Sequence, residues 1–330
     1  MKPLRMLKRW LKSRPAVQRW LYERRNRNQF ASPWVHELML ADKLRVDTYR
    51  RAIDKLIGPN DVVVDLGTGT GILSQFASHR NPRKIYAIDH SEIIDTARKV
   101  AAYNGVNGIE FIRVSSQQLK LPEKVDVILH EQIGPSLFDE NMVENIVDLR
   151  DRLLRPGGKI LPGRFDLFLE PVTLKAEFRI PFIWEFDLHG VRYDCMRPKD
   201  EHVVSEHDSW SSYYLREVNG YEVDSLLCDP VPVMSFDLET LRPADLPKTL
   251  RYRKTVARAG QMDVIGLFFR VAFDDDIYFD TSPLSPRTHF GMWSYRVDAL
   301  ELRPRDQLDF DWKIGDLRDM RTWDYRFQKV

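Results

Sequence analysis

The chain has few cysteines and no long apolar run. Cys195 and Cys228 are two among 330 residues, too few for a disulfide framework or a cysteine-based metal site. The apolar runs are the size of strands, such as Val125 to Leu129, far below the roughly 20 residues that span a bilayer. Charged residues interrupt every apolar stretch near the N-terminus, so no signal peptide is expected. We therefore expect a cytoplasmic protein with no membrane span and no metal.

Charge of the two signs is balanced overall but not along the chain. Residues 1–27 hold ten Lys and Arg against Glu23 alone, so the remaining body carries a net charge of −8. An acidic body suits a cationic substrate, although charged runs are also typical of solvated surfaces. No nucleic-acid partner is expected. Leu4, Leu7 and Leu11 recur at helical spacing, which predicts a basic amphipathic helix over residues 1–29.

From Asp61 onward, short β-rich runs alternate with helical stretches. Such alternation is typical of a parallel sheet with helices packed on it. We predict a doubly wound, Rossmann-like α/β domain over residues 30–160, which opens with one helix at about 36–57. The expected strands are Val62–Val64, Lys84–Ile88, Ile109–Val114 and Val125–His130, and the expected helices are Ile72–Ser78, Ile93–Asn104 and Asn141–Leu154, the last ended by Pro156-Gly157-Gly158.

After Leu161-Pro162 the apolar periodicity changes from 3.6 to two, with Pro and Gly between the runs. This pattern predicts a mostly β, barrel-like domain over residues 161–330, which we expect to bind the substrate. The polar stretch at about 197–222 interrupts it and is interpreted as an inserted arm. The expected strands are Phe165–Leu169, Val231–Phe236, Val264–Phe273 and Met292–Val297.

A glycine-rich turn follows the first expected strand, with the sequence Asp65-Leu66-Gly67-Thr68-Gly69-Thr70-Gly71. Glycines permit a tight turn and a close approach of a ligand to the backbone. The G-T-G-T-G spacing differs from the G-x-G-x-x-G of dinucleotide enzymes. It resembles class I methyltransferases, which predicts S-adenosyl-L-methionine as cofactor. The residues assigned to it here are Asp65, Gly67, Gly69 and Gly71, Asp89 for the ribose hydroxyls, and Gln117 for the adenine.

Two glutamates, Glu131 and Glu140, bracket the loop after the fourth strand. Ligands of open α/β sheets bind beyond the carboxyl ends of strands, so this loop should face the cofactor. Two carboxylates suit a cationic acceptor with several donors, and a guanidinium has five N–H donors and a pKa above about 12. The pair could also be structural, with Glu140 serving only as an acid in the first turn of a helix.

Three separated motifs together resemble the protein arginine methyltransferase family, over residues 30 to 297. They are the segment Val35–Tyr49, the two glutamates nine positions apart, and Thr281-Ser282-Pro283 followed by Thr288-His289-Phe290. The resemblance implies a methyltransferase that acts on the guanidino group of arginine, and a homodimer formed through the 197–222 arm. Because several motif positions differ, we expect a divergent, bacterial-type member.

The resemblance also implies roles for individual residues. Arg45 would pair with the carboxylate of the cofactor's methionine part. Asp42 and His289 would form a hydrogen-bonded pair beside the acceptor, and would orient it or help to remove a proton. Glu131 and Glu140 would be the catalytic acids that hold the guanidinium. The acceptor site would be lined by Phe30, Met39 and Phe290.

Several positions depart from the family's pattern. Asn26 and Arg27 stand where the family has two aromatics of a Tyr-Phe-x-x-Tyr motif, and Phe30 lacks the hydroxyl of the last tyrosine. Phe290 replaces a tryptophan, and His130 and Gln132 flank Glu131 in place of Ser and Trp. These changes favour free arginine, a related guanidino metabolite or one arginine in a dedicated peptide. Two alternatives stay open, a small-molecule N- or O-methyltransferase and a cofactor-binding scaffold without turnover.

Overall fold

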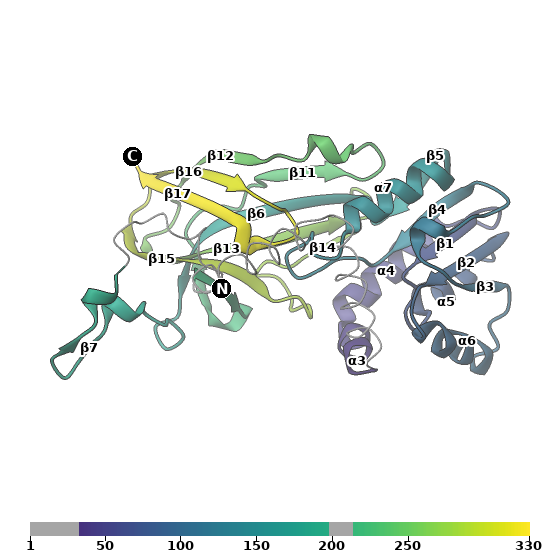
Figure 1. Cartoon of the computed structure of the whole chain (residues 1–330), viewed down its shortest axis with the longest axis horizontal. Coiled ribbons are helices and arrows are strands. Elements are labelled where there is room, and N and C mark those ends of the chain that lie inside the picture. Colours follow the sequence, from purple (N-terminus) through teal and green to yellow (C-terminus); the bar gives the residue numbers. More distant parts are fainter. Residues whose placement is uncertain (1–32, 198–213) are drawn as a thin grey trace, which may run out of the picture. The chain divides into compact units, whose positions relative to one another are not determined.

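The computed structural model describes residues 33–197 and 214–330 (Figure 1). The basic helix predicted for residues 1–29, the substrate residue Phe30 and residues 198–213 lie outside this range. The chain divides into two compact units. The first runs to Glu131 and includes Arg152–Leu161, and the second consists of Gln132–Asp151 and Pro162–Val330. The segment Gln132–Asp151 is thus grouped with the second unit, whereas the expected first domain ran without interruption to residue 160.

The first unit holds, in the described part of the chain, a five-stranded sheet of order β3-β2-β1-β4-β5 with every pair parallel (Figure 1). The predicted parallel sheet of a Rossmann-like domain is therefore confirmed. Its strands are β1 (Val62–Leu66), β2 (Lys84–Asp89), β3 (Ile109–Arg113), β4 (Val125–His130) and β5 (Leu154–Leu161), and its helices are α3 (Pro33–Ala41), α4 (Lys43–Leu56), α5 (Ile72–Ser78), α6 (Ile93–Tyr103) and the short 3-10 turn η1 (Ser116–Gln118).

The strand order fixes where a ligand would bind. Strand β1 is buried along its whole length, as a central strand of a parallel sheet should be, with β2 on one side and β4 on the other. The chain moves outward from β1 to β2 and β3, and then returns to β4. The sheet therefore changes direction between β1 and β4, and the crevice at such a switch point lies beyond the carboxyl ends of the strands.

The single helix expected at 36–57 is two helices, α3 and α4, separated at Asp42. The expectation was wrong because it ignored the capping ability of this aspartate. The Asp42 carboxylate accepts a hydrogen bond from the backbone N–H of Arg45 at 3.1 Å and forms the N-cap of α4. Asp competes with the helix ladder for backbone donors, so it starts a new helix rather than continuing the old one.

Helix α7 (Met142–Leu153) is followed directly by β5, so Pro156-Gly157-Gly158 lies inside a strand and does not end the helix. The pairing of β4 with β5 shifts register between Val125 and Val127, and Gly157 has a φ of +74°. A Cβ on Gly158 would meet the Asp126 carbonyl oxygen at 2.9 Å. The glycines therefore permit an irregular start of β5 close to β4.

The second unit is mostly antiparallel β structure, as predicted for this part of the chain. In its described residues one sheet runs β10-β6-β13-β15-β9, with β11 on β6 and β14 on β13, and a second runs β12-β16-β17. The strands are β6 (Arg164–Leu174), β9 (Leu215–Val218), β10 (Val223–Leu226), β11 (Met234–Asp237), β12 (Thr249–Thr255), β13 (Gly260–Ala272), β14 (Tyr278–Asp280), β15 (Met292–Leu302), β16 (Gln307–Ile314) and β17 (Trp323–Lys329).

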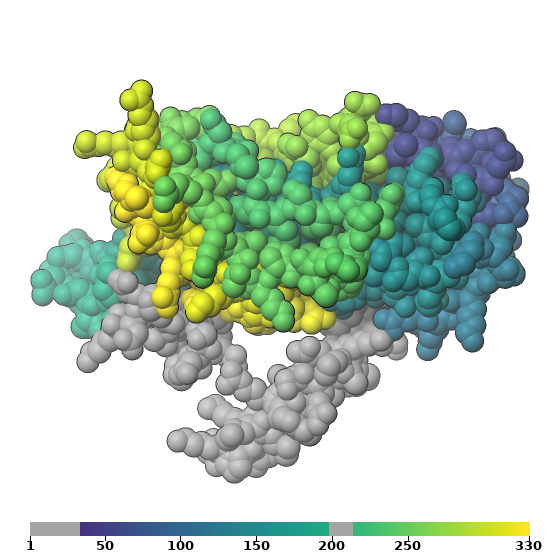
Figure 2. Space-filling model, turned by 90° about the horizontal axis from the view of Figure 1, so that it is seen from above, coloured from purple at the N-terminus to yellow at the C-terminus, as the bar shows by residue number. Residues whose placement is uncertain are grey.

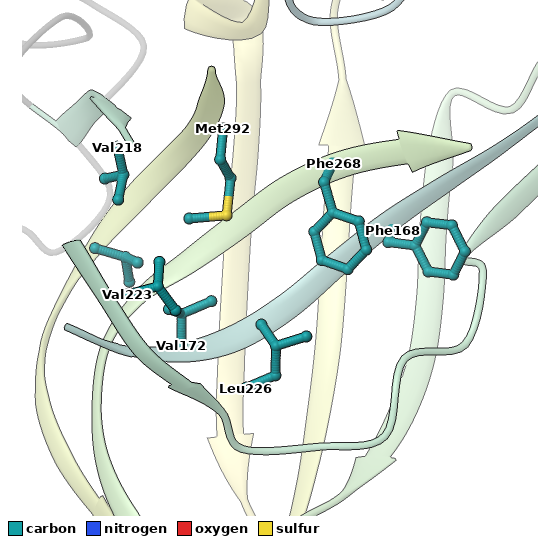
Figure 3. Packing of buried hydrophobic residues seen from close by; sticks show 8 residues of the cluster. Phe168, Val172, Val218, Val223, Leu226, Phe268 and Met292 are labelled. Carbon is teal, nitrogen blue, oxygen red and sulfur yellow. The ribbon is translucent and has the colours of Figure 1, made fainter. Parts of the chain in front are cut away.

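Two apolar clusters hold these sheets. One lies along the larger sheet and gathers side chains from five strands (Figure 3). The other is aromatic and joins the sheets, since the Tyr295 ring packs against Trp312 and Tyr325 with centroids 4.9 and 5.4 Å apart. Trp312 and Trp323 are fully buried. The first cluster consists of Phe168, Val172, Val218, Val223, Leu226, Val264, Phe268 and Met292.

Residues 198–213 of the arm expected at 197–222 lie outside the described residues. The end of the expected arm, Leu215–Val218, is strand β9, which pairs with β15 and buries Val218. Before this stretch, β7 (Asp187–Leu188) and β8 (Val191–Arg192) form a hairpin that is not paired with the larger sheet. This hairpin forms a separate lobe at the left edge of the space-filling view (Figure 2). No helix within the described residues is long and apolar enough to span a membrane.

Candidate active site

The glycine loop after β1 is held in a conformation that other residues rarely adopt. Gly67, Gly69 and Gly71 have φ values of +71°, +54° and +84°. A Cβ on Gly71 would lie 3.1 Å from the Ala97 Cβ, and one on Gly69 would lie 3.2 Å from Cε1 of His36. The loop therefore needs glycine for its backbone and for its close neighbours. Its exposed part at Gly67 leaves backbone open to a ligand.

Asp65 is hydrogen-bonded to this loop and to the helix that follows it. Its side chain is fully buried, and Oδ2 accepts hydrogen bonds from Thr68 Oγ1 at 2.7 Å and Ser74 Oγ at 2.6 Å. Oδ1 is buried with no hydrogen-bond partner among the described residues. Burial raises the pKa of Asp65 to about 6, against the hydrogen bonds that lower it. Asp65 thus connects Thr68 of the loop with Ser74 of α5.

Asp89 ends β2, next to the glycine loop. Its Oδ2 accepts from the Gly69 backbone N–H at 3.1 Å, and its Oδ1 accepts from the backbone N–H and the hydroxyl of Ser91 at 2.8 and 2.7 Å. A carboxylate has about four acceptor positions. Three are used within the described residues, so one position remains on Oδ2. A diol could take that position, and a second position opens if the Ser91 hydroxyl turns away.

Glu131 lies directly beyond β4 and is paired with Arg45. The Arg45 Nη1 lies 3.1 Å from Glu131 Oε2, and the two side chains are 7% and 14% exposed. The other end of the Arg45 fork donates from Nη2 to the Met39 carbonyl at 2.5 Å. The Arg45 Nε is buried and has no partner among the described residues. Two residues predicted to bind different ligands therefore contact each other.

Tyr49 and Arg152 hold two loops near the glycine turn, although neither residue was predicted to have a role. The Tyr49 hydroxyl donates to the His130 carbonyl at 2.9 Å, and burial together with the charge of Glu131 raises the Tyr49 pKa well above its ordinary value. Arg152 donates to the carbonyls of Leu119 and Ser116 at 2.9 and 2.8 Å, which holds the turn that carries the half-buried Gln117. Tyr49 lay in a matched motif, whereas Arg152 gave no signal.

Glu140 and the loop that leads to it belong to the second unit. Leu137 and Phe138 of this loop are buried, and the Phe138 ring lies 5.5 Å from that of Phe236 on β11. These apolar contacts explain why residues 132–151 group with the second unit. Glu140 itself is half-buried, two residues before α7.

His289 and Phe290 lie in the loop between β14 and β15. The exposed His289 ring packs on Phe290 with centroids 4.0 Å apart, and Phe290 is buried against Phe269 at 5.4 Å. The structure thus anchors the loop through Phe290 and presents His289 to its outside. Asp42, in the first unit, is buried as the cap of α4. The pairing of Asp42 with His289 stays a prediction.

Within the first unit, a glycine turn follows β1, Asp89 ends β2 and Glu131 follows β4, all at one edge of a parallel sheet. A glycine turn and an acid at these places define a nucleotide-type site of the class I methyltransferase fold. Residues 63–158 match the family model of a methyltransferase domain, and residues 167–299 match that of the arginine methyltransferase oligomerization subdomain.

The curated relatives that the chain resembles are named protein arginine N-methyltransferases. The chain is 32% identical over 273 residues to "Protein arginine N-methyltransferase 6" of Danio rerio, with 80% of this chain and 76% of that protein covered. It is 30% identical over 265 residues to the protein of the same name from Xenopus laevis, with 78% and 76% covered. The chain belongs to the protein arginine methyltransferase family, and it is a methyltransferase that uses S-adenosylmethionine. Nothing in these comparisons supports a bacterial-type member.

Solved structures agree with this fold. The chain is similar to one chain of the "Trypanosoma brucei PRMT1 enzyme-prozyme heterotetrameric complex with AdoHcy", with a TM-score of 0.74, 25% identity, and 91% of this chain and 94% of that chain covered. It is also similar to Arabidopsis thaliana protein arginine methyltransferase 10, with a TM-score of 0.72, 22% identity, and 91% and 93% covered.

The residues of the first unit fit the cofactor. The open backbone at Gly67, the remaining acceptor position on Asp89 and the unpartnered donor on Arg45 Nε match a ligand with a ribose diol and a carboxylate. Among the described residues, no group of three His, Cys, Asp or Glu side chains is placed to hold a metal ion. Cys228 is buried, which raises its pKa to about 12, and Cys195 is exposed.

Proposed function

We propose that this chain transfers a methyl group from S-adenosylmethionine to a guanidino nitrogen of arginine, with Glu131 and Glu140 holding the guanidinium. The observation that carries the proposal is the placement of Glu131. It lies at the end of β4, beside the strand that feeds the glycine loop, and Arg45 fixes its carboxylate in a nearly buried position. A fixed anion there suits a cationic acceptor.

The residues of the first unit would hold the cofactor. When bound, S-adenosylmethionine supplies a methyl group on a positively charged sulfur. The loop at Gly67–Gly71 accommodates it, Asp89 accepts from its ribose, and Gln117 contacts its adenine. Arg45 uses its two Nη groups within the chain, so its Nε is the donor that we assign to the cofactor's carboxylate.

The two glutamates would prepare the acceptor. Carboxylates on two guanidinium nitrogens draw the positive charge toward themselves, which leaves electron density on the third nitrogen. The cofactor would supply the methyl carbon to that nitrogen, with its sulfur as the leaving group, and the nitrogen would then lose one N–H proton. We assign this proton to the His289 imidazole, oriented by Asp42. Most of the rate would come from positioning.

The acceptor that we propose is small: free arginine, a related guanidino metabolite or one arginine in a dedicated peptide. Asn26 and Arg27 stand at two of the three positions where the family has an aromatic residue. An arginine in place of an aromatic residue would repel a cationic polypeptide substrate. The glutamates still hold the head group. A site that binds a guanidinium strongly but a substrate polypeptide weakly favours a small acceptor.

The test is release of S-adenosylhomocysteine with free arginine, an arginine-rich peptide or lysine as acceptor. We expect release with guanidino acceptors and a higher kcat/KM for free arginine than for the peptide. Release only with acceptors that lack a guanidino group would favour the small-molecule alternative. Binding of the cofactor without release for any acceptor would favour the scaffold. A large advantage for the peptide would overturn the proposed small acceptor.

Substitution of the glutamates tests their roles. Glu131→Gln and Glu140→Gln keep the side-chain shape but remove the charge, and each should lower kcat by about 10²-fold or more, the scale of losing one preorganised electrostatic contact. Affinity for S-adenosylhomocysteine should stay near wild type in Glu140→Gln. Glu110→Gln on β3 is the matched control and should leave kcat unchanged. Wild-type turnover in either site variant contradicts the roles.

We also propose that the chain forms a homodimer. The oligomerization subdomain matched at 167–299 includes the β7–β8 hairpin, which leaves the sheet and carries exposed apolar side chains. The hairpin is the described part to which we assign this contact, and Leu215–Val218 at the end of the expected 197–222 arm belongs to the sheet.

A further inference from the structure

The chain has a strained backbone on both sides of Glu140. Leu137 and Asn141 have φ values of +74° and +54°, and neither is glycine. The left-handed region is costly for a side chain such as leucine and less so for asparagine. Such conformations persist only where the surroundings hold them, and they gather at functional sites. The contacts that hold these two residues therefore help to fix the backbone that carries Glu140.

The first strained position is held by packing. Leu137 is fully buried, and its backbone N–H donates to the Gly134 carbonyl at 2.8 Å. Asp139 covers Gly134 so closely that a Cβ on this glycine would lie 2.0 Å from the Asp139 carboxylate. The same carboxylate accepts from the Ser136 backbone at 3.1 Å. Residues 134–139 are thus a compact turn that ends immediately before Glu140.

The second strained position, Asn141, is held by Arg318. The Arg318 Nη1 donates to the Asn141 side-chain oxygen at 3.1 Å and lies 3.6 Å from Glu144 in the first turn of α7. The Asn141 carbonyl accepts from the Asn145 backbone at 3.0 Å and so begins the helix. Arg318 therefore contacts both the strained residue and the helix that follows it.

Arg318 is itself fixed by Asp316. Its Nε and Nη2 donate to the two oxygens of this carboxylate at 2.9 and 2.8 Å, and its backbone N–H donates to Oδ1 at 3.0 Å. These hydrogen bonds raise the pKa of Arg318. They also lower the pKa of Asp316, although burial alone would raise it. A fork held on one side presents its remaining nitrogen in a defined direction.

We propose that Arg318 is a positioning residue that sets the direction of the Glu140 carboxylate through Asn141. Arg318 lies in the β16–β17 connection, outside residues 167–299 that match the oligomerization subdomain. The proposal rests on the proposed function, because it gives Glu140 the acceptor. Without Arg318 the left-handed Asn141 loses its side-chain partner, and the peptide that joins it to Glu140 relaxes. Small misplacements of this kind lower turnover strongly.

The experiment compares Arg318→Met with Arg321→Met. Arg321 forms the same kind of fork on Asp319, at 2.7 and 2.6 Å, three residues further along, which makes it a matched control. We expect Arg318→Met to lower kcat about tenfold. The dissociation constant of S-adenosylhomocysteine and the melting temperature should stay near those of Arg321→Met. Loss of melting temperature in step with kcat, beyond the control, would show a general structural role and overturn the proposal.

Two further backgrounds locate the effect. In Glu140→Gln, the Arg318→Met change should cause no further loss of kcat, because the group that it aligns is already neutral. In Asn141→Gly, which permits the left-handed backbone but removes the acceptor, Arg318→Met should likewise add little. Multiplicative losses in both backgrounds would show that Arg318 acts elsewhere.

Amide hydrogen exchange gives a measurement that does not need turnover. Arg318→Met should speed exchange at residues 137–145 relative to Arg321→Met, while the strands exchange equally in both. If the wild-type protein methylates no guanidino acceptor, the proposed function fails, and the exchange data still decide whether Arg318 holds the loop. Equal exchange in the two variants overturns the positioning role whatever the activity.

Discussion

Three carboxylates near the glycine loop differ in what their oxygens contact. Asp65 has one oxygen bonded to hydroxyls and one buried without a partner in the described residues. Asp89 has three of about four acceptor positions in use. Glu131 faces a guanidinium. All three groups are carboxylates, but they differ in how many hydrogen-bond acceptor positions remain unused. The number of unused positions decides which of them can bind a ligand and which can only support the site.

Asp89 should be the residue on which cofactor affinity depends. Asp89→Ala should weaken binding of S-adenosylhomocysteine by about 1.5–3 kcal/mol, the scale of hydrogen bonds to a charged group. Ser91→Ala is the informative control, because it removes a hydrogen bond to Oδ1 and frees an acceptor position there. Calorimetry should therefore show unchanged or tighter binding for Ser91→Ala. Unchanged affinity in Asp89→Ala would refute the ribose assignment.

Asp65 should make stability fall as pH rises. Its pKa in the folded protein is about 6, above the ordinary 3.8, because burial disfavours the charge. The folded state thus binds the proton more tightly, and this contribution to stability is full below pH 3.8 and is lost as the pH rises through 6. Asp65→Asn lacks this loss and keeps an oxygen for the hydroxyls of Thr68 and Ser74.

Between pH 5 and 7 the wild-type protein should lose about 1 kcal/mol of unfolding free energy relative to Asp65→Asn. Chemical denaturation of both proteins at the two pH values measures this difference. A constant difference between the two proteins would mean that Asp65 titrates at its ordinary pKa.

At the scale of elements, Asp42 caps a helix and is also the residue that we propose to orient His289. As the N-cap of α4 it stabilises the helix, and an alanine there should cost about 1 kcal/mol of unfolding free energy. Asparagine caps nearly as well, so Asp42→Asn should keep the stability of the wild type. If the charge of Asp42 also orients His289, Asp42→Asn should be stable but slow. Thermal melting and kcat of both variants, with Asp47→Asn as control, test this; a fully active Asp42→Asn removes Asp42 from catalysis.

The elements that the sequence predicts well are those with local signals. The strand expected at Val62–Val64 and observed at Val62–Leu66, its glycine loop and the helix Ile72–Ser78 follow from a short run of valines and from glycines at a strand-to-helix turn. The alternating runs of the second half likewise predict β6, β13 and β15 near their observed positions. In each case the residues that define the element lie within about ten positions of one another.

Features that depend on partners far along the chain were missed. The helix break at Asp42 is an exception, because its cause is a local hydrogen bond to Arg45. The ion pair of Arg45 with Glu131 joins residues far apart in the sequence, which the resemblance assigned to different ligands. The grouping of residues 132–151 with the second unit depends on apolar contacts such as Phe138 with Phe236. Arg318 carries no motif at all. Spacing along one sequence cannot report such contacts, because tertiary packing decides them.

At the scale of the whole molecule, the β7–β8 hairpin is the feature from which we argue a contact between two copies of the chain. Its turn, His189-Gly190, has φ values of +55° and +87°, as a tight two-residue hairpin requires. The paired Leu188 and Val191 are 50% and 58% exposed, which is costly for two apolar side chains on a projecting lobe. A second copy of the chain would cover them.

We therefore expect the wild-type protein to be a dimer in light scattering, and Leu188→Asp with Val191→Asp to shift it toward monomer. Charges placed in a buried apolar contact are strongly unfavourable, whereas the hairpin of a free monomer tolerates them in water. Point changes are preferable to deletion of residues 197–222, because that deletion removes β9 from the sheet. Val231→Asp, at a 58% exposed position outside the hairpin, is the control and should remain dimeric. A wild-type monomer contradicts the dimer itself. If the double variant stays dimeric, the interface lies elsewhere, because the two copies then associate without the apolar contact of the hairpin.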